Sequence, residues 1–307
     1  MTPISYWVAF HVALVALLVA EYGVHRAVRD ARRKAMWTLG MWVGAAVVLA
    51  GLVVPRFHAV GATQYLAGYA LEQTLSLDNL FVFLLLFRVF RIPEGRQSRV
   101  LFWGVAGAVV LRGAFIAGGL GLLERFHWIG IVFGAVLLVA AVRLLKSEDV
   151  EEETARAPRW LVWLTRWRPV SESQEQFLVK EDGRWMATVL LLALVAVELT
   201  DVVFALDSIP AVLSITRVPF LAYTSNIMAV MGLRSMYVLL AGMLSRLRYL
   251  HYGLAAVLGF AAVKMLAAGW VVIGPVVSRG VIAGMVGVTV VASVVRRREN
   301  GNGPRIV

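Results

Sequence analysis

Residues 186–209 read MATVLLLALVAVELTDVVFALDSI. The stretch is long and apolar enough for a helix, which rises about 1.5 Å per residue, to cross a hydrocarbon core of about 30 Å. It nevertheless holds three acids, Glu198, Asp201 and Asp207. An acid at the bilayer centre costs at least about 2.5–3.5 kcal/mol, so these three must face a protein interior. The stretch therefore predicts one membrane-spanning helix inside a bundle of several.

The same composition recurs along the whole chain, which has 307 residues, 60% hydrophobic and 16% charged. Soluble domains have about 45–50% apolar and about 25% charged residues. Nine apolar segments are long enough to span a membrane: 4–22, 36–54, 64–87, 100–122, 126–145, 186–209, 219–244, 250–273 and 278–295. The first lacks a signal-peptide cleavage pattern and should remain as a helix. We predict an all-α, polytopic protein of about nine transmembrane helices, with residues 1–307 as one transmembrane domain.

Basic residues set the expected orientation. The first, third, fifth and seventh loops and the tail carry two to eight Lys or Arg each, and the loops between them carry one each. Because basic loops stay on the cytoplasmic side, this alternation predicts an inner (plasma) membrane protein with its N-terminus outside and its C-terminus in the cytoplasm. It also explains the net charge of +11 without nucleic acid as a partner, so the expected partner is the lipid bilayer.

One long cytoplasmic loop, residues 146–185, separates the fifth and sixth segments. It begins with an acidic cluster at 148–153, which we interpret as solvated chain. Trp160, Trp163 and Trp167 follow at helical spacing among arginines, a mixture typical of a helix that lies at the membrane interface. Residues 177–185 contain Asp-Gly, a turn signal that predicts a small hairpin.

A short set of charged side chains remains inside the predicted spans. It comprises Glu72, Asp78, Glu198, Asp201, Asp207, Arg112, Arg234 and Lys264, with Glu21 near the end of the first span. In the third span, Glu72, Ser76 and Asn79 share one helical face and form a polar stripe. Such charges must pair with one another, bind a cation or carry protons.

Two acids of the sixth span give the strongest local signal. Glu198 and Asp201 are one turn apart on one face, and two carboxylates that close repel each other unless a cation or a proton lies between them. Asp207 lies on the other side of an ideal helix, but Pro210 removes the hydrogen bond to the carbonyl of Leu206. A break there would turn Asp207 inward, as in broken helices that line cavities.

The nature of the available ligands narrows the choice of ion. Cysteine is absent, so the donors are carboxylate, amide, hydroxyl and carbonyl oxygens, which suit magnesium, calcium or manganese. His11 and His251 lie in or near spans, where a single histidine is more often structural. We expect the bases Arg112, Arg234 and Lys264 to be charge partners of the acids. In the alternative, purely structural interpretation each of them neutralises one acid as a buried ion pair. That would leave two acids without a basic partner.

The third and sixth spans contain similar motifs. Glu72 and Asp78 enclose the same five-residue interval as Asp201 and Asp207, and each second acid precedes a small polar residue and an aliphatic one. The two spans are expected to run in opposite directions across the membrane. An inverted repeat that meets at the midplane is common in secondary transporters.

Three stretches carry a resemblance to a known family: EQTLSLDNLFVF at 72–83, ELTDVVFALDSIPAV at 198–212 and TSNIMAVMGLRSMY at 224–237. With them, residues 64–275 resemble the TerC/Alx family of the LysE-type transporter superfamily. Relatives have Asp where this chain has Glu21. The family's motif positions here are Glu72, Asp78, Asn79, Glu198, Asp201, Asp207, Ser208, Asn226 and Arg234.

The resemblance implies a manganese exporter that acts in metal homeostasis, in a family linked to tellurium resistance. We expect Asp78, Glu198 and Asp201 to be metal ligands, and Glu72 and Asp207 to belong to the same ion-binding set. Asn79 and Asn226 are secondary candidates. Asn226 could equally cap its helix. The expected function is export of a divalent metal ion, with Mn²⁺ as first candidate and proton exchange as the coupling. The expectation includes no permanently bound cofactor and no enzyme activity.

Three other functions fit parts of the sequence. The loop at 146–185 could make the chain a scaffold for cytoplasmic or membrane protein partners. A membrane-embedded aspartyl protease would need two facing aspartates, such as Asp78 and Asp201. Export of an organic cation is the nearest variant of the transporter interpretation.

Overall fold

A computed structural model describes residues 2–125, 131, 134–135, 137–139, 141–142, 170–171, 175–181, 183–244, 250–267, 270 and 274–301. The chain divides into two compact units. The first unit comprises residues 1–80, 101–127 and 201–242, and the second comprises 81–100, 128–200 and 243–307. The division cuts through the interior of α3 (Val54–Val89), α4 (Glu94–Arg125) and α7 (Val189–Ile215), so these helices contribute to both units.

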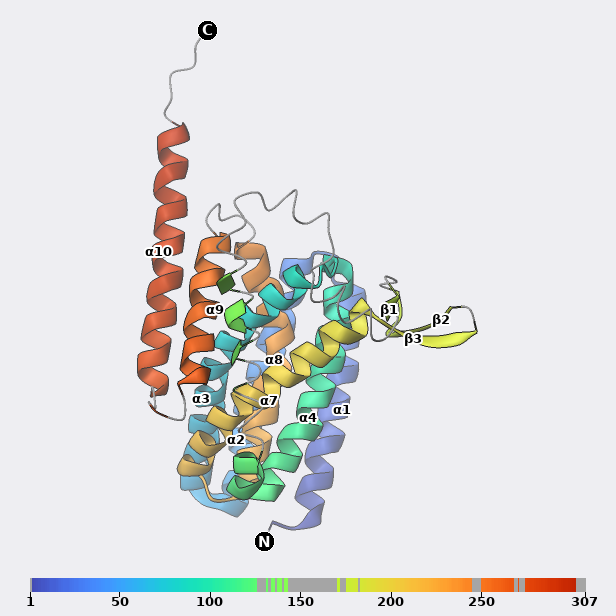
Figure 1. Cartoon of the computed structure of the whole chain (residues 1–307). Coiled ribbons are helices and arrows are strands. Elements are labelled where there is room, and N and C mark those ends of the chain that lie inside the picture. Colours follow the sequence, from blue (N-terminus) through green and yellow to red (C-terminus); the bar gives the residue numbers. More distant parts are fainter. Residues whose placement is uncertain are drawn as a thin grey trace. The chain divides into compact units, whose positions relative to one another are not determined.

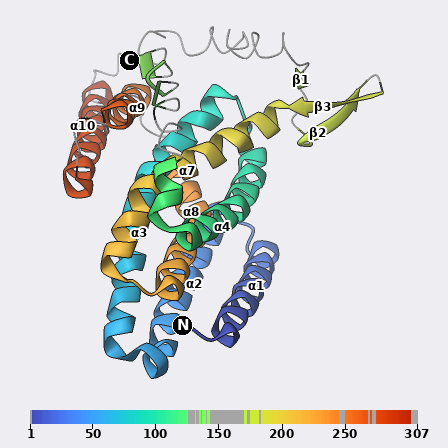
Figure 2. The same cartoon turned by 60° about the horizontal axis from the view of Figure 1, so that its bottom comes forward.

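The first unit is a helical bundle in which α8 (Pro219–Leu244) is central. Figures 1 and 2 show α8 among α2 (Ala31–Leu52), α3 and α4. The unit also contains α1 (Ile4–Ala27) and the part of α7 from residue 201 onward. The α8 backbone between 220 and 233 carries buried side chains throughout. The polar residues of this helix are therefore held inside the protein, where they can meet charges from its neighbours.

Burial in α1 and α2 follows the pattern of a membrane protein. One side of α1 exposes a stripe of aliphatic side chains: Ile4, Val8, Val12, Val15 and Val19. The opposite side buries the acid Glu21, which is 3% exposed. Apolar side chains face outward and the charge faces inward because the surrounding solvent is hydrocarbon. The helices are joined by a short connection in which the Asp30 carboxylate accepts a 2.6 Å hydrogen bond from the backbone N–H of Arg33.

The structure supports most of the predicted spans. Five helices are long and apolar enough to cross a membrane: α1, α2, α3, the Glu94–Gly118 part of α4, and the Pro219–Met243 part of α8. Two shorter apolar helices, Ala255–Leu266 and Gly280–Ser293, coincide with the last two predicted spans. The segment predicted at 126–145 lies largely outside the described residues. The chain is an integral, multi-pass membrane protein, and nine spans stay a prediction.

A sixth span is bent where the sequence places Pro210. The segments Val189–Ala205 and Ser208–Ile215 of α7 form an angle of 41°. Proline removes one backbone hydrogen bond of the preceding turn, which allows the axis to change direction there. The predicted break in this helix is confirmed. A second irregularity, the left-handed backbone of His58 with φ 59°, kinks α3 near its start and had no signal in the sequence.

The second unit contains a small sheet and two packed helices. Strand β3 (Arg184–Thr188) lies between β1 (Val170–Ser171) and β2 (Leu178–Glu181), parallel to the first and antiparallel to the second. Gly183 takes φ 78° in the turn, so the predicted hairpin is confirmed. The helices α9 (Leu250–Leu266) and α10 (Pro275–Gly301) lie side by side (Figures 1 and 2). The predicted interfacial helix at Trp160–Trp167 and the acidic cluster lie outside the described residues.

Candidate functional site: a buried cluster of acids around one arginine

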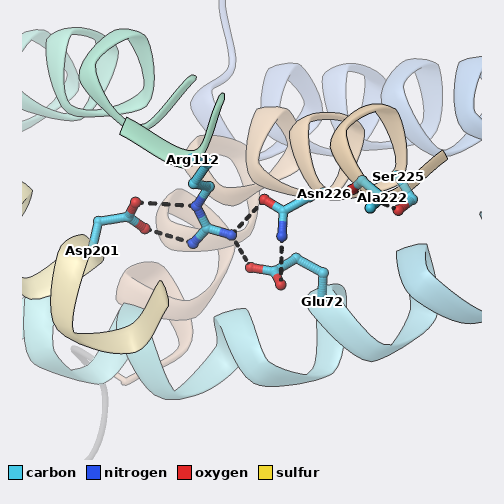
Figure 3. Close-up of polar contacts among 6 residues, drawn as sticks. All are labelled: Glu72, Arg112, Asp201, Ala222, Ser225 and Asn226. Carbon is cyan, nitrogen blue, oxygen red and sulfur yellow. Dashed lines mark hydrogen bonds and ion pairs between the residues drawn. The ribbon is translucent and has the colours of Figure 1, made fainter. Parts of the chain in front are cut away.

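Four helices of the first unit bring charged and amide side chains to one point. Figure 3 shows Glu72 from α3, Arg112 from α4, Asp201 from α7 and Asn226 from α8 facing one another. None is more than 4% exposed. The four residues are far apart in the chain, so only the folded bundle creates this group, which we call the acid–arginine cluster.

Arg112 is the centre of the acid–arginine cluster. Its Nε and Nη2 donate to the two carboxylate oxygens of Asp201, at 3.1 and 2.6 Å, in a bidentate pair. Its Nη1 donates both to the Glu72 carboxylate and to the Asn226 side-chain oxygen, the latter at 2.7 Å. The Asn226 amide nitrogen donates to the other Glu72 oxygen at 3.0 Å. The planar guanidinium can serve three partners because it carries five N–H donors in a fixed fork.

The charges of the cluster do not balance. Two carboxylates, Glu72 and Asp201, surround one guanidinium, and Asn226 is neutral. With all three groups ionised, the site carries one excess negative charge. The arrangement differs from the alternative of one acid for each base, because the single base Arg112 pairs with two acids. An excess charge in a low-dielectric interior is costly, which favours binding of a further cation.

The helices approach closely beside the cluster because small residues line their contacts. A Cβ atom on Gly68 of α3 would lie 2.9 Å from Ser225 Oγ of α8, and one on Gly113 of α4 would lie 3.2 Å from a ring carbon of Tyr223. The Ser225 hydroxyl itself donates to the carbonyl of Ala222 in its own helix (Figure 3). Small residues allow such close approach between helices in membranes.

Replacing Gly68 by valine should lower the stability of the bundle by about 1–3 kcal/mol, since the new side chain overpacks the contact of α3 with α8. The matched control is Gly44→Val in α2, where nothing lies within 4 Å of an added Cβ. Thermal unfolding of the purified proteins, followed by helical circular dichroism, measures both. Equal melting temperatures for the two variants would contradict the packing described here.

Beyond Glu72, the same face of α3 carries further buried oxygen atoms. Within the described residues, Tyr65 Oη, Ser76 Oγ and Asn79 Oδ1 are buried and have no hydrogen-bond partner. Residues 65, 72, 76 and 79 are spaced by seven, four and three, so they share one helical face. Ser208 Oγ of α7 is likewise buried and has no hydrogen-bond partner. The polar stripe predicted on this helix is confirmed, and it extends toward Tyr65.

A second ion pair lies elsewhere in the first unit. Arg234 of α8 donates to one oxygen of the Glu21 carboxylate, and the indole nitrogen of Trp42 donates to the other at 3.3 Å. The Arg234 guanidinium also stacks over the Phe102 ring, 5.7 Å from its centroid. This pair is electrically balanced, unlike the acid–arginine cluster. The sequence did not indicate Trp42, although an indole N–H inside a span always requires an acceptor.

His11 belongs to an aromatic group rather than to a charged one. Its Nδ1 lies 2.8 Å from the carbonyl of Trp7 and its Nε2 lies 3.1 Å from the hydroxyl of Tyr223. With Nδ1 protonated, the ring donates to the carbonyl and accepts from Tyr223. The rings of Trp7, Phe10 and Phe220 pack around them. This environment agrees with the structural role expected for a single histidine.

The remaining predicted site residues are placed less completely. Asp78 lies on α3 and Asp207 on α7, with side chains outside the described part of the structure. Glu198 lies on α7 one turn before Asp201 and is half-buried, and Lys264 is half-buried on α9 in the second unit. Among the described residues, no group of three or more His, Asp or Glu side chains could hold a metal ion. The metal set of Asp78, Glu198 and Asp201 therefore stays a prediction.

Comparisons with known proteins agree with these observations. The family model described as "Integral membrane protein TerC family" matches residues 57–301. A membrane protein of Myxococcus xanthus is 40% identical over 302 residues, which cover 95% of this chain and 93% of that protein. Alx of Escherichia coli K12, named as a candidate membrane-bound redox modulator, is 39% identical over 92% of this chain and 90% of its own length.

A plant protein is similar over a smaller part. The chloroplastic thylakoid membrane protein TERC of Arabidopsis thaliana is 42% identical over 75% of this chain and 60% of its own length. No solved structure matches the chain. The family model covers most of the chain, including all four residues of the acid–arginine cluster. The chain therefore belongs to the TerC family of integral membrane proteins.

Proposed function

We propose that the chain is a transporter that exports a divalent metal ion, with Mn²⁺ as the first candidate. The main observation that supports this proposal is that the acid–arginine cluster has two acids and one base. Glu72 and Asp201 are both buried between helices and share one base. A protein gains little stability from such a site, because taking ions out of water costs more than an imperfect pair returns. A buried group with more acids than bases in a membrane protein favours a role in ion passage.

In this proposal Arg112 acts as a resident cation. Its guanidinium lies between the two carboxylates when no metal is bound. It compensates one of their two negative charges and so lowers the cost of burying them in the membrane. An incoming metal ion would attract the Glu72 or Asp201 carboxylate and displace the guanidinium toward the other acid and Asn226. Arg112 donates two hydrogen bonds to Asp201 but only one to Glu72, whose second bond comes from the neutral Asn226 amide. Glu72 is therefore the acid we expect to exchange first.

The chemistry of the buried donors supports a hard divalent cation. Carboxylates at Glu72 and Asp201 and unpartnered oxygens at Ser76, Asn79 and Ser208 provide oxygen ligands only. Such donors suit Mn²⁺, Mg²⁺ and Ca²⁺, and thiolate-seeking metals have no sulfur ligand from cysteine in this chain. Protonation of either acid would weaken metal binding, so exchange of metal for protons is the coupling that we propose.

The same residues argue against the alternatives. Asp201 is held by Arg112 and is not free to form an aspartyl protease dyad, so we propose a carrier without enzyme activity or a permanent cofactor. A redox role, as named for the Alx relatives, could not use thiols of this chain, because it has no cysteine. We place the protein in the inner membrane with its C-terminus in the cytoplasm, on the distribution of its basic residues.

Inverted membrane vesicles from cells that produce the chain provide the test. Mn²⁺, Mg²⁺, Ca²⁺ and lysine are supplied outside, with a pH gradient imposed or collapsed, and vesicles from cells without the protein serve as the control. We expect Mn²⁺ to accumulate inside and the uptake to stop when the gradient is removed. Uptake of lysine alone would favour an organic cation as cargo. Failure to move any of the four would contradict the transporter proposal.

A further inference from the structure

The hairpin before α7 has two chemically different faces. In β2 and β3, Leu178 pairs with Ala187 and Lys180 with Trp185, while Val179 pairs with Met186 and Glu181 with Arg184. Because paired residues point to the same side and neighbours alternate, Leu178, Lys180, Trp185 and Ala187 form one face. We call it the tryptophan face. It contains one base and no acid.

The opposite face carries the buried residues of the sheet. Glu181 accepts a 2.5 Å hydrogen bond from the Ser171 hydroxyl, and Ser171 and Thr188 are buried. Val179 and Met186 are half-buried. Across from Glu181, Arg184 supplies a charge of the opposite sign. This side is therefore partly buried toward α7 and exposed at its turn end, where Glu181 and Arg184 lie.

The tryptophan face, in contrast, is open. Trp185 is 72% exposed and Leu178 is 49% exposed, and Lys180 is exposed between them. Large apolar side chains exposed side by side on an ordered element form a candidate contact surface. Tryptophan, leucine and lysine together are typical of the boundary between hydrocarbon and headgroups, where the indole ring is partly apolar and the amine meets phosphate.

The hairpin is held next to a membrane-spanning helix. Strand β3 ends at Thr188 and α7 begins at Val189 without a connecting loop (Figure 1). The Thr188 hydroxyl donates to the carbonyl of Gln176 at 2.7 Å, and the backbone N–H of Leu191 donates to the same hydroxyl. Arg99 at the start of α4 donates to the carbonyl of Glu175. These bonds fix the orientation of the strands relative to the ends of two helices.

We propose that the tryptophan face lies in the headgroup layer of the bilayer, so that the hairpin contacts anionic lipid. Trp185 precedes the first residue of α7 by four positions, which at about 3.3 Å per residue keeps it within reach of the membrane surface. Lys180 then meets lipid phosphates, and Leu178 and Trp185 enter the boundary with the acyl chains. The contact would hold the start of α7, the helix that carries Asp201, at a fixed depth. This inference rests on the membrane topology and does not depend on metal export.

The absence of native cysteine makes a direct test simple, because any introduced cysteine is unique. Leu178→Cys labels the tryptophan face and Arg184→Cys labels the opposite face, and both positions are exposed. Each full-length variant is labelled with a fluorophore and reconstituted into vesicles of phosphatidylcholine and phosphatidylglycerol. Part of the lipid carries a nitroxide quencher near the headgroup. A soluble quencher, iodide, is added in a parallel sample.

We expect the label at 178 to lose most of its emission to the lipid quencher and to resist iodide, and the label at 184 to show the reverse. Adding Lys180→Gln should weaken the lipid quenching at 178 in phosphatidylglycerol vesicles and leave it unchanged in pure phosphatidylcholine. Equal lipid quenching at both positions would overturn the proposal. So would a label at 178 that resists both quenchers, since protein would then cover this face.

Discussion

Replacing Arg112 by methionine should lower the free energy of unfolding by about 3–5 kcal/mol, the range found when one partner of a buried ion pair is removed. The reason is that Glu72 and Asp201 would remain buried and negative, without the five N–H donors that now lie between them. Methionine keeps the length and apolar stem of the side chain, so the loss reports the charge and the hydrogen bonds. Thermal unfolding in detergent micelles, compared with the wild type, measures it.

Neutralising the acids should restore the stability. The triple variant Arg112→Met, Glu72→Gln, Asp201→Asn has no charge in the cluster, and replacing a buried ionic group by neutral residues is often without cost. We expect it to melt close to the wild type and to be inactive. Arg112→Lys retains the charge but cannot form the bidentate pair, so its melting temperature should lie between those of Arg112→Met and the wild type. If the triple variant melts as low as Arg112→Met, the stability lost in Arg112→Met does not come from the two buried acids that it leaves without a base.

Neutralising one acid at a time should instead remove transport. In Asp201→Asn, and likewise in Glu72→Gln, Arg112 balances the remaining carboxylate, and the site has no excess charge to attract a divalent ion. We expect metal flux to fall by at least about tenfold, equivalent to about 1.4 kcal/mol. Both variants should fold, because they leave no acid without a base. Metal uptake by inverted vesicles, normalised to the amount of protein, measures the effect.

The control for this prediction is another buried acid. Glu21→Gln changes a carboxylate that is 3% exposed and bound to Arg234 and Trp42, but it lies outside the acid–arginine cluster. Its flux per folded molecule should stay near that of the wild type. Glu72→Asp, which keeps the charge one methylene shorter, should retain part of the activity. A loss of flux in Glu21→Gln as large as in Asp201→Asn would show that any buried acid matters equally.

The sequence predicted the positions of the helices well and the contacts between their charged side chains poorly. The segment predicted at 219–244 coincides with α8, and the bend of α7 near Pro210 follows from the chemistry of one residue. Both features depend on composition or on the next few residues in the chain. The helical period likewise placed Glu72, Ser76 and Asn79 on one face, where the structure buries all three.

The sequence could not show in the same way which basic residue contacts which acid. Arg112 binds Asp201 across a separation of 89 residues, and Arg234 binds Glu21 across 213. Helical period gives the face of a residue but says nothing about which helix lies opposite. The sequence therefore reached the correct conclusion that Arg112 and Arg234 pair with acids, and missed that one base would hold two acids.

Binding of Mn²⁺ to the purified protein tests the central claim most directly. Free Mn²⁺ gives a paramagnetic resonance signal that disappears on binding, so wild type and Asp201→Asn can be titrated side by side in lipid nanodiscs. We predict saturable binding by the wild type that weakens as the pH falls, and little or no binding by Asp201→Asn. Equal binding by both proteins, or none by the wild type at any pH, would contradict the account.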